Sequence, residues 1–468
     1  MTHFLARIAA IFLFTLSAPF LTAQTIPNRH IAAGWGNSFF VDPQGTLWGW
    51  GCARLEKGKD KRLPDIAMTG AESVFVDPQE SVFLTRKRDG SLWGWGQSSS
   101  GELGVIKEDG YGWVYTPRKL VNRAIYALSS INTFILDPDG TLRVWGKDRL
   151  TRGDNRRKNP LKPAKILDNV AQFSSSLSHT LALKKDGSLW AWGENQCGTL
   201  GTGENTFHEY PVPVDLTPLG TRKIVRVATR MTESFLVADD GTVWNWGEPN
   251  NMKPYCMDAP RWVPTLLNSI DNVDDIAVGE AHELYLKKDG SVWMIAYLAR
   301  EKRTDPVKVM DNAAEIAAGS YHSLVLKKDG SLWAWGENEC GQLGDGTYTA
   351  RNHPTRVRFD LSPDDLPTPE DSQKTASGAS GIDYAQVLRW EGGTFDLCRF
   401  SEEGIKYLDL PPELVEKLRP CLRQRQENTG DSQEDSYGLS DDDIDILNMI
   451  ILYNMNRQNG KETGFAKQ

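Results

Sequence analysis

The sequence of 468 residues has few of the side chains that metal centres and disulfide-built scaffolds need. It contains six cysteines and seven histidines. It has no CxxC pair and no HExxH motif, so the spacing predicts no zinc site. GxSxG and GxxxxGK[ST] are also absent, which removes two common signatures of hydrolases and of phosphate-binding loops. The residues therefore predict no catalytic group, no cofactor and no metal.

Long apolar runs are confined to the beginning of the chain. An apolar stretch from Ile8 to Leu21 follows Arg7 and ends in small residues near Ala23. This pattern predicts a signal peptide over residues 1–23. No later segment is long and apolar enough to span a bilayer. We therefore expect an exported protein, periplasmic or extracellular, without a membrane span once the signal is removed.

Basic charge is not concentrated anywhere in the chain. The formal net charge is −9, and the segment from Asp360 to the end holds 22 acidic and 11 basic residues. The remainder, with 40 acidic and 42 basic residues, is almost neutral. Nucleic-acid binding needs a concentrated basic surface, so we expect no nucleic-acid partner.

Repetition dominates what is present. "KDGSLWAWG" occurs twice, ending at Gly193 and at Gly336, and five weaker copies bring the total to seven. A glycine occupies the same turn position in every copy, at intervals of 40 to 54 residues: Gly45, Gly90, Gly140, Gly187, Gly241, Gly290 and Gly330. A period of this length is typical of propellers and solenoids.

Each copy predicts a β-hairpin. An alternating apolar stretch such as "HSLVL" (322–326) precedes the turn, and the Asp-Gly pair tolerates positive φ. Short β-prone pieces such as "EIAAG" (315–319) and "TRVRF" (355–359) bring the count to about four strands, as one propeller blade needs. We expect the paired tryptophans, such as Trp333 and Trp335, to pack in the core. A surplus strand at 355–359 is expected to complete the first blade and close the ring.

The copies are similar to the repeat of the regulator of chromosome condensation family. The stretch from His322 to Gly344 matches nearly all of "HSLxLxxDGxLWxWGxNxxGQLG", and the stretch from His179 to Gly201 matches almost as well. The resemblance implies an all-β, seven-bladed propeller with four-stranded blades over residues 30–359. Repeats three and six depart from the motif at Arg143, Ile295 and Ala296, and we expect those blades to be looser or shaped for a partner.

The same resemblance suggests two activities. The founding member exchanges nucleotide on a nuclear GTPase, which an exported protein would not meet. A secreted bacterial member inhibits β-lactamase by covering its active site with one propeller face. Propellers host many functions, so the fold alone selects neither activity.

Two sets of residues are candidate sites. Eight residues before most turn glycines, or ten in repeat two, stands a polar side chain, which we interpret as a ring with a structural role rather than a metal site: Asn37, Glu80, Asn132, His179, Glu233, His282 and His322. Variable inter-blade loops carry aromatic residues suited to protein recognition: Tyr111, Trp113, Tyr115, Phe207, Tyr210, Tyr255 and Trp262. Asp137 and Asp139 lack the other ligands of a calcium loop and are interpreted as turn formers.

Six cysteines allow fifteen pairings, and the sequence alone does not select one. If disulfides join adjacent blades, three bonds are possible, namely Cys52–Cys340, Cys197–Cys256 and, in the tail, Cys398–Cys421.

The tail predicts a small α+β extension with five parts. These are an acidic Pro/Ser/Gly linker (360–381), a hairpin-helix module (382–425), an acidic linker (426–439), an amphipathic helix (440–456) and a disordered end (457–468).

Together these features favour an exported, non-catalytic scaffold, a monomeric ring that binds a partner protein through one face. Two alternatives stay open, a secreted enzyme inhibitor of the β-lactamase-inhibitor type and a carbohydrate-active or lyase-like enzyme with an axial cleft. A carboxylate cluster with perturbed pKa values in the axial pocket would favour the enzyme.

Overall fold

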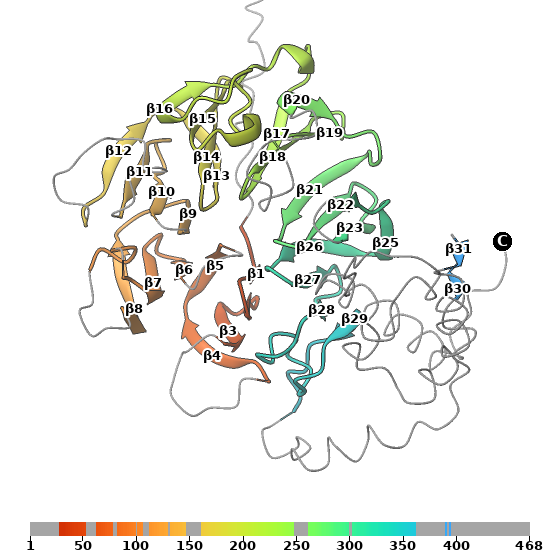
Figure 1. The fold of residues 1–468 in the computed structure, drawn as a ribbon. Coiled ribbons are helices and arrows are strands. Elements are labelled where there is room, and N and C mark those ends of the chain that lie inside the picture. Colours follow the sequence, from red (N-terminus) through yellow and green to blue (C-terminus); the bar gives the residue numbers. More distant parts are fainter. Residues whose placement is uncertain are drawn as a thin grey trace, which may run out of the picture.

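The fold is a ring of seven β-sheets around a central axis (Figure 1). The structure is a computed structural model, and it describes residues 28–52, 62–77, 82–99, 101–105, 112–129, 132–146, 161–247, 261–298, 302–361, 389–390 and 393–394. Helix is limited in these ranges to the short 3-10 turns η1 (Gln196–Gly198) and η2 (Thr217–Leu219). The predicted seven-bladed propeller is confirmed.

Each blade is a sheet of strands that follow one another in the chain. Blade one comprises β1 (Ile31–Ala33), β2 (Asn37–Val41), β3 (Thr46–Gly51) and β4 (Asp65–Thr69), and blade two comprises β5 (Ala71–Val76), β6 (Val82–Lys87), β7 (Leu92–Gln97) and β8 (Trp113–Val121). Blade three comprises β9 (Tyr126–Ser129), β10 (Thr133–Leu136), β11 (Leu142–Trp145) and β12 (Ala164–Leu167), and blade four comprises β13 (Val170–Ser175), β14 (His179–Lys184), β15 (Leu189–Gly193) and β16 (His208–Pro213).

The last three blades keep the same order, with one addition in blade six. Blade five comprises β17 (Ile224–Arg230), β18 (Glu233–Ala238), β19 (Val243–Gly247) and β20 (Arg261–Leu266). Blade six comprises β21 (Val273–Val278), β22 (His282–Lys287), β23 (Val292–Leu298), β24 (Lys302–Arg303) and β25 (Val307–Met310). Blade seven comprises β26 (Ala313–Ala318), β27 (His322–Lys327), β28 (Leu332–Gly336) and β29 (Arg351–Arg356). In blade six β25 is the regular fourth strand, and β24 extends β23 into an extra hairpin.

The Asp-Gly-Ser sequence shapes the hairpin turn. In blade seven Gly330 has a φ of +84°, a conformation that glycine adopts without strain. The Asp329 carboxylate accepts hydrogen bonds from the Ser331 backbone N–H at 2.9 Å and from its hydroxyl at 2.6 Å. The Trp333 indole N–H then donates to the Ser331 hydroxyl at 3.0 Å. The repeated motif therefore fixes both the turn and the first tryptophan of each pair.

The second tryptophan of the pair packs between blades, as predicted. Trp50, Trp95, Trp145, Trp192, Trp246 and Trp335 are all buried. Trp50 joins a cluster with Leu324 and Leu343 of blade seven, and its indole N–H donates to the Gln342 carbonyl at 2.8 Å. The first tryptophan is half-buried in most blades, with a lysine over its ring in several, for example Lys184 on Trp190.

Blade three retains its packing although Arg143 replaces the first tryptophan. The Arg143 guanidinium bonds to Asp137 at 2.6 Å, and in blade one Trp48 donates to the equivalent Asp42 at 3.0 Å. Blade six is the one that is rebuilt, because β23 continues past Ala296 into the extra hairpin with β24.

The predicted closure by a surplus strand is wrong. Strand β29 pairs with β28 in its own blade, and blade one has a fourth strand of its own, β4. The ring closes instead through contacts between complete blades, which include the hydrophobic cluster around Trp50 and the disulfide Cys52–Cys340. At the start of the ring, Arg29 also forms a two-bond ion pair with Asp275 of blade six, at 2.6 and 3.1 Å.

The tail is described only at two short strands. These strands, β30 (Arg389–Trp390) and β31 (Gly393–Thr394), pair where the sequence predicts a hairpin. The predicted signal peptide, the helices at 411–425 and 440–456, and the linkers apart from residues 360–361 lie outside the described residues. Within the described part, no helix is long and apolar enough to cross a membrane.

Candidate functional site: the loop face of the ring

The two faces of the ring differ in the connections that they carry. The Asp-Gly hairpins lie on one face, which we call the turn face. The connections from first to second strand and from third to fourth strand lie on the other, which we call the loop face. The inner strands β1, β5, β9, β13, β17, β21 and β26 all contribute residues to an axial cavity of about 160 Å³ between the two faces.

The predicted polar ring lies just inside the loop face and is buried. Its six described members, which stand at or next to the start of the second strand, are Asn37, Asn132, His179, Glu233, His282 and His322. In blade two Val82 holds this register, opposite Gly96, whereas Glu80 lies outside the described residues. Burial removes these side chains from contact with a partner, and their hydrogen bonds show what they do instead.

The three histidines each link one blade to the next. His322 Nε2 lies 2.8 Å from the Ser38 hydroxyl of blade one. That hydroxyl donates to the Gln342 carbonyl at 2.8 Å, so His322 must be the donor to Ser38. The corresponding distances for the other two pairs, His179 to Ser234 and His282 to Ser323, are also 2.8 Å. The histidines of the polar ring therefore link neighbouring blades and do not form an exposed rim.

Burial makes these links sensitive to acid. Burial lowers the pKa of His179 and of His322 to about 3 and that of His282 to about 4. The unfolded chain takes up protons near pH 6.5 and the folded ring does not, so the free energy of unfolding falls as the pH falls below 6.5.

We expect three such histidines to remove about 4 kcal/mol of stability between pH 7 and pH 5.5. His30 acts in the opposite direction, because its hydrogen bond to Glu315 raises its pKa, and it reduces the net loss. Urea unfolding across this pH range measures the effect. A triple His→Asn variant, with the residue found at Asn37 and Asn132, should have a flatter profile; an unchanged profile would contradict the assignment.

The junction between blades five and six departs from this pattern. The histidine position holds Glu233, and the serine position of the next blade holds Glu283. Three residues before Glu233 stands Arg230, where blades six and seven have Gly279 and Gly319. The Arg230 and Glu233 side chains form a buried ion pair. Blade five thus has an Arg-x-x-Glu sequence where blades six and seven have Gly-x-x-His.

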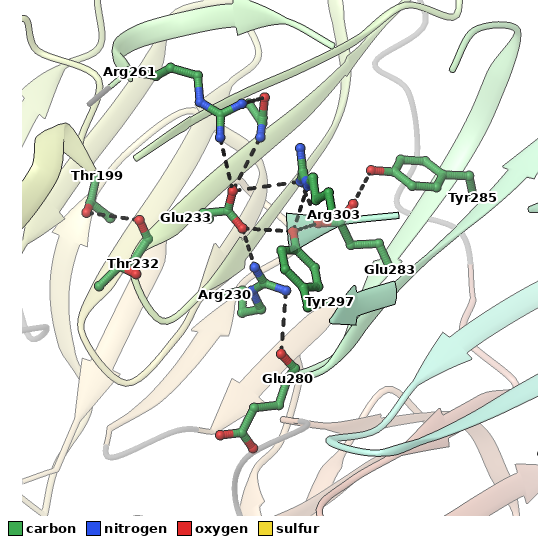
Figure 2. Close-up of polar contacts among 11 residues, drawn as sticks. Thr199, Arg230, Thr232, Glu233, Arg261, Glu280, Glu283, Tyr285, Tyr297 and Arg303 are labelled. Carbon is green, nitrogen blue, oxygen red and sulfur yellow. Dashed lines mark hydrogen bonds and ion pairs between the residues drawn. The ribbon is translucent and has the colours of Figure 1, made fainter. Parts of the chain in front are cut away.

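Three more side chains contact one oxygen of the Glu233 carboxylate, Oε1 (Figure 2). Asn245 donates to Glu233 Oε1 at 3.3 Å and accepts from Arg261 at 2.7 Å. Arg261 Nη2 and Arg303 Nη2 lie 3.5 and 3.7 Å from the same oxygen. Arg303 comes from the extra hairpin of blade six, so the rebuilt blade supplies part of the network.

The Glu283 carboxylate is held in the same network (Figure 2). Tyr285 donates to Glu283 at 2.5 Å, and Arg303 donates to it at 2.5 Å. The Tyr297 hydroxyl also bonds to Glu283, lies 3.1 Å from Glu233 and accepts from Arg303 Nε at 2.8 Å. Arg230 covers the Tyr297 ring at 3.9 Å from its centroid. Two carboxylates, two phenols and three arginines together form one closed cluster.

The cluster is arranged for packing rather than for proton transfer. Burial alone would raise the pKa of Glu283, but Arg303 and Arg230 hold it below its usual range. Burial and the neighbouring carboxylates raise the pKa values of Tyr285 and Tyr297. These directions keep Glu283 ionised and both phenols neutral near pH 7, so none of these three groups is poised as a general acid or base.

The loop face also carries most of the exposed aromatic side chains. Of the seven exposed aromatics among the described residues, six lie on or near this face: Trp35, Tyr115, Phe207, Tyr210, Tyr321 and Tyr348. Of the seven aromatics predicted from the variable loops, Tyr115, Phe207 and Tyr210 are exposed here, Trp113 and Trp262 are half-buried, and Tyr111 and Tyr255 lie outside the described residues.

The sequence prediction missed three of these rings, including the two most exposed. Trp35 and Tyr348 are each 53% exposed, and Tyr321 is 39% exposed. Trp35 and Tyr321 follow the first strands of blades one and seven, and Tyr348 precedes the last strand of blade seven. Trp35 and Tyr321 lie in short first-to-second-strand connections close to a glycine, which the prediction did not consider. Tyr348 lies in the β28–β29 loop, a connection of the same kind as the one that carries Phe207.

The disulfide Cys52–Cys340 lies on this face and joins blades one and seven, with the two Cα atoms 5.1 Å apart and 288 residues between them in the chain. This pairing was one of those predicted for adjacent blades. Cys197 is also disulfide-bonded, and its predicted partner Cys256 lies outside the described residues, as do Cys398 and Cys421.

The described lining of the axial cavity has few ionisable side chains. Among its described lining residues Asp77 is the one carboxylate, and the cations are Arg29 and Arg230. In the described part of the chain, no group of three or more His, Cys, Asp or Glu side chains could hold a metal ion.

Seven consecutive antiparallel blades around one axis, six of four strands and one of five, define a seven-bladed β-propeller. Models of the regulator of chromosome condensation (RCC1) repeat match residues 170–199 and 313–342, and in a second form 186–229 and 329–367. The chain therefore carries RCC1 repeats in these two stretches, and its propeller is RCC1-like.

Curated relatives match part of their own length. RCC1 domain-containing protein RUG3, mitochondrial, of Arabidopsis thaliana is 26% identical over 301 residues, covering 55% of this chain and 64% of RUG3. The ultraviolet-B receptor UVR8 of the same plant is 27% identical over 252 residues, covering 50% of this chain and 56% of UVR8. Human E3 ubiquitin-protein ligase HERC2 is 27% identical over 282 residues, covering 58% of this chain and 5% of HERC2. The chain thus spans less than two thirds of these relatives.

Two solved structures show the same fold. Prp20p of Saccharomyces cerevisiae superposes with a TM-score of 0.58 at 20% identity, covering 72% of this chain and 95% of Prp20p. Human WBSCR16 has a TM-score of 0.56 at 18% identity, covering 69% of this chain and 93% of WBSCR16.

Proposed function

We propose that this protein is an exported, non-catalytic β-propeller that binds a partner protein through its loop face. The observation that carries the proposal is that six of the seven exposed aromatic side chains of the described residues lie on or near that face. Aromatic residues bury a large area with few rotamers to fix, so they are enriched at the centres of protein interfaces. Exposed rings on one side of a rigid ring are suited to a flat or convex protein surface.

Two further features support parts of the proposal. A disulfide such as Cys52–Cys340 persists in oxidising compartments, which supports export together with the apolar N-terminal segment. The single carboxylate among the described residues of the axial cavity gives no carboxylate pair for an axial active site, which supports a non-catalytic role. Yeast Prp20p, which has the same fold, has been described for its binding to Gsp1p and histones, so this fold can present a protein-binding surface.

The loop-face triple variant Trp35→Ala, Tyr210→Ala and Tyr348→Ala tests the proposal. About half of each of these side chains is exposed, so their loss should leave the ring folded. We expect the full-length protein to retain a partner from its native host, and the variant to bind it at least about thirtyfold more weakly, as hot-spot residues do.

The matched control is the double variant Leu266→Ser and Val307→Ser, which changes exposed apolar residues on the outer strands β20 and β25. It should bind as the parent does. Equal binding by the loop-face variant and the parent would rule out the loop face as the binding surface.

A further inference from the structure

One sector of the loop face combines exposed aromatic rings with carboxylates. Trp35 and Tyr321 occupy equivalent connections in the neighbouring blades one and seven. The residues directly before them are in contact, because the Ser320 N–H donates to the Gly34 carbonyl at 3.4 Å. Both rings are exposed, so the sector offers two aromatic surfaces on adjacent connections.

Two acidic residues, Glu280 and Glu337, lie next to Tyr321. Glu280 belongs to the equivalent connection of blade six, and its N–H donates to the Ser320 carbonyl at 3.1 Å. Glu337 follows β28, and its N–H donates to the Tyr321 carbonyl at 3.0 Å. Burial, the charges of Glu280 and Glu337 and a hydrogen bond with Glu280 raise the pKa of Tyr321. Both carboxylates are therefore close enough to act on the phenol.

The Glu280 carboxylate is not used by the buried cluster. Arg230 contacts Glu280 through its backbone carbonyl, at 3.5 Å, while the carboxylate points away from the cluster (Figure 2). No lysine or arginine among the described residues forms an ion pair with Glu280. Glu337 and, two residues later, Glu339 are exposed on the same face. The sector thus combines negatively charged side chains with exposed aromatic rings.

We propose that this sector, formed by Glu280, Tyr321, Glu337 and Trp35, binds an arginine-bearing segment of the partner protein. A guanidinium can lie over an aromatic ring while its N–H groups donate to carboxylates, and its aliphatic stem covers the ring edge. A nucleic-acid or anionic lipid surface would be repelled by the same carboxylates. The inference rests on the proposed function and gives the chemistry of the partner at one part of the loop face.

Two labelled peptides test it directly on the full-length, oxidised protein. One is a Gly-Ser peptide with three arginines, and the other has three citrullines, which keep the shape of arginine without its charge. Fluorescence anisotropy should show binding of the arginine peptide, with the citrulline peptide about tenfold weaker or more. The affinity for the arginine peptide should also fall as salt is raised, because the contacts are solvent-exposed.

The variant pair Glu280→Gln with Glu337→Gln should lose about tenfold in affinity for the arginine peptide. The matched control, Asp168→Asn with Asp311→Asn, removes two exposed carboxylates from the turn face and should change nothing. Absence of binding, equal binding of both peptides, or equal losses in both variant pairs would overturn the inference. If the captured partner depends on the loop-face aromatics but not on Glu280 and Glu337, the proposed function stands and this inference fails.

Discussion

Replacing Glu283 by Leu is expected to lower the free energy of unfolding by about 3–5 kcal/mol, the range found when one partner of a buried ion pair is removed. The substitution leaves Arg303 buried beside one carboxylate instead of two and takes the hydrogen-bond acceptor from Tyr285. Replacing Arg303 by Met should have an effect of similar size, because it leaves Glu283 with less positive charge around it. Urea unfolding of each variant measures these losses.

A double-mutant cycle separates the pair from its surroundings. The double variant Glu283→Leu with Arg303→Met should be no less stable than either single variant, which gives a coupling energy of several kcal/mol. The same cycle at the exposed pair Lys165 and Asp168 is the control, with a coupling expected below about 1 kcal/mol. If the two couplings were similar, the buried cluster would not act as a unit and blade six would be held by its apolar contacts.

Removal of the Cys52–Cys340 disulfide should have an effect of comparable size. The bond closes a separation of 288 residues, and chain entropy assigns about 5–6 kcal/mol to a cross-link of this length. The double variant Cys52→Ser with Cys340→Ser should therefore unfold at a clearly lower urea concentration than the oxidised parent.

Reduction provides the matching control. Reductant should destabilise the parent by more than it destabilises the double variant, because the variant has no bond to lose at this junction. If the double variant were as stable as the oxidised parent, closure would depend mainly on the Trp50 cluster and on the Arg29–Asp275 ion pair.

The hairpin within each blade could be predicted from the sequence. The hairpin is specified within about ten residues, because Asp329, Gly330 and Ser331 determine the turn by contacts with near neighbours. A fixed period of such local units predicts the number of blades without knowledge of any contact between them. The same period predicted which cysteines lie on adjacent blades, and one of those pairs, Cys52 with Cys340, is bonded.

Contacts between blades were harder to predict. The sequence showed a polar residue at one position in most repeats, but not that His322 reaches Ser38 across a blade junction, because the two are 284 residues apart. The closure prediction failed for a similar reason. Strand β29 pairs with β28 of its own blade. The number of repeats alone does not show to which blade a terminal strand belongs.

The buried cluster did have a signal in the sequence. Arg230 with Glu233 replaces the small residue and histidine found three apart in other repeats, and Glu283 replaces a serine or threonine. These replacements fall on facing positions of adjacent blades, so together they indicate that side-chain ion pairs have replaced the usual histidine–serine contact at this junction. That the two positions face each other follows from the order of the blades in the structure.

The central claim is that a partner protein meets the loop face. Hydrogen exchange of the full-length protein with and without the captured partner tests this claim most directly. We predict that protection on binding falls on the connections around Trp35, Phe207, Tyr321 and Tyr348 and leaves the Asp-Gly turns unchanged. Protection confined to the Asp-Gly turns would place the partner on the turn face and contradict the account.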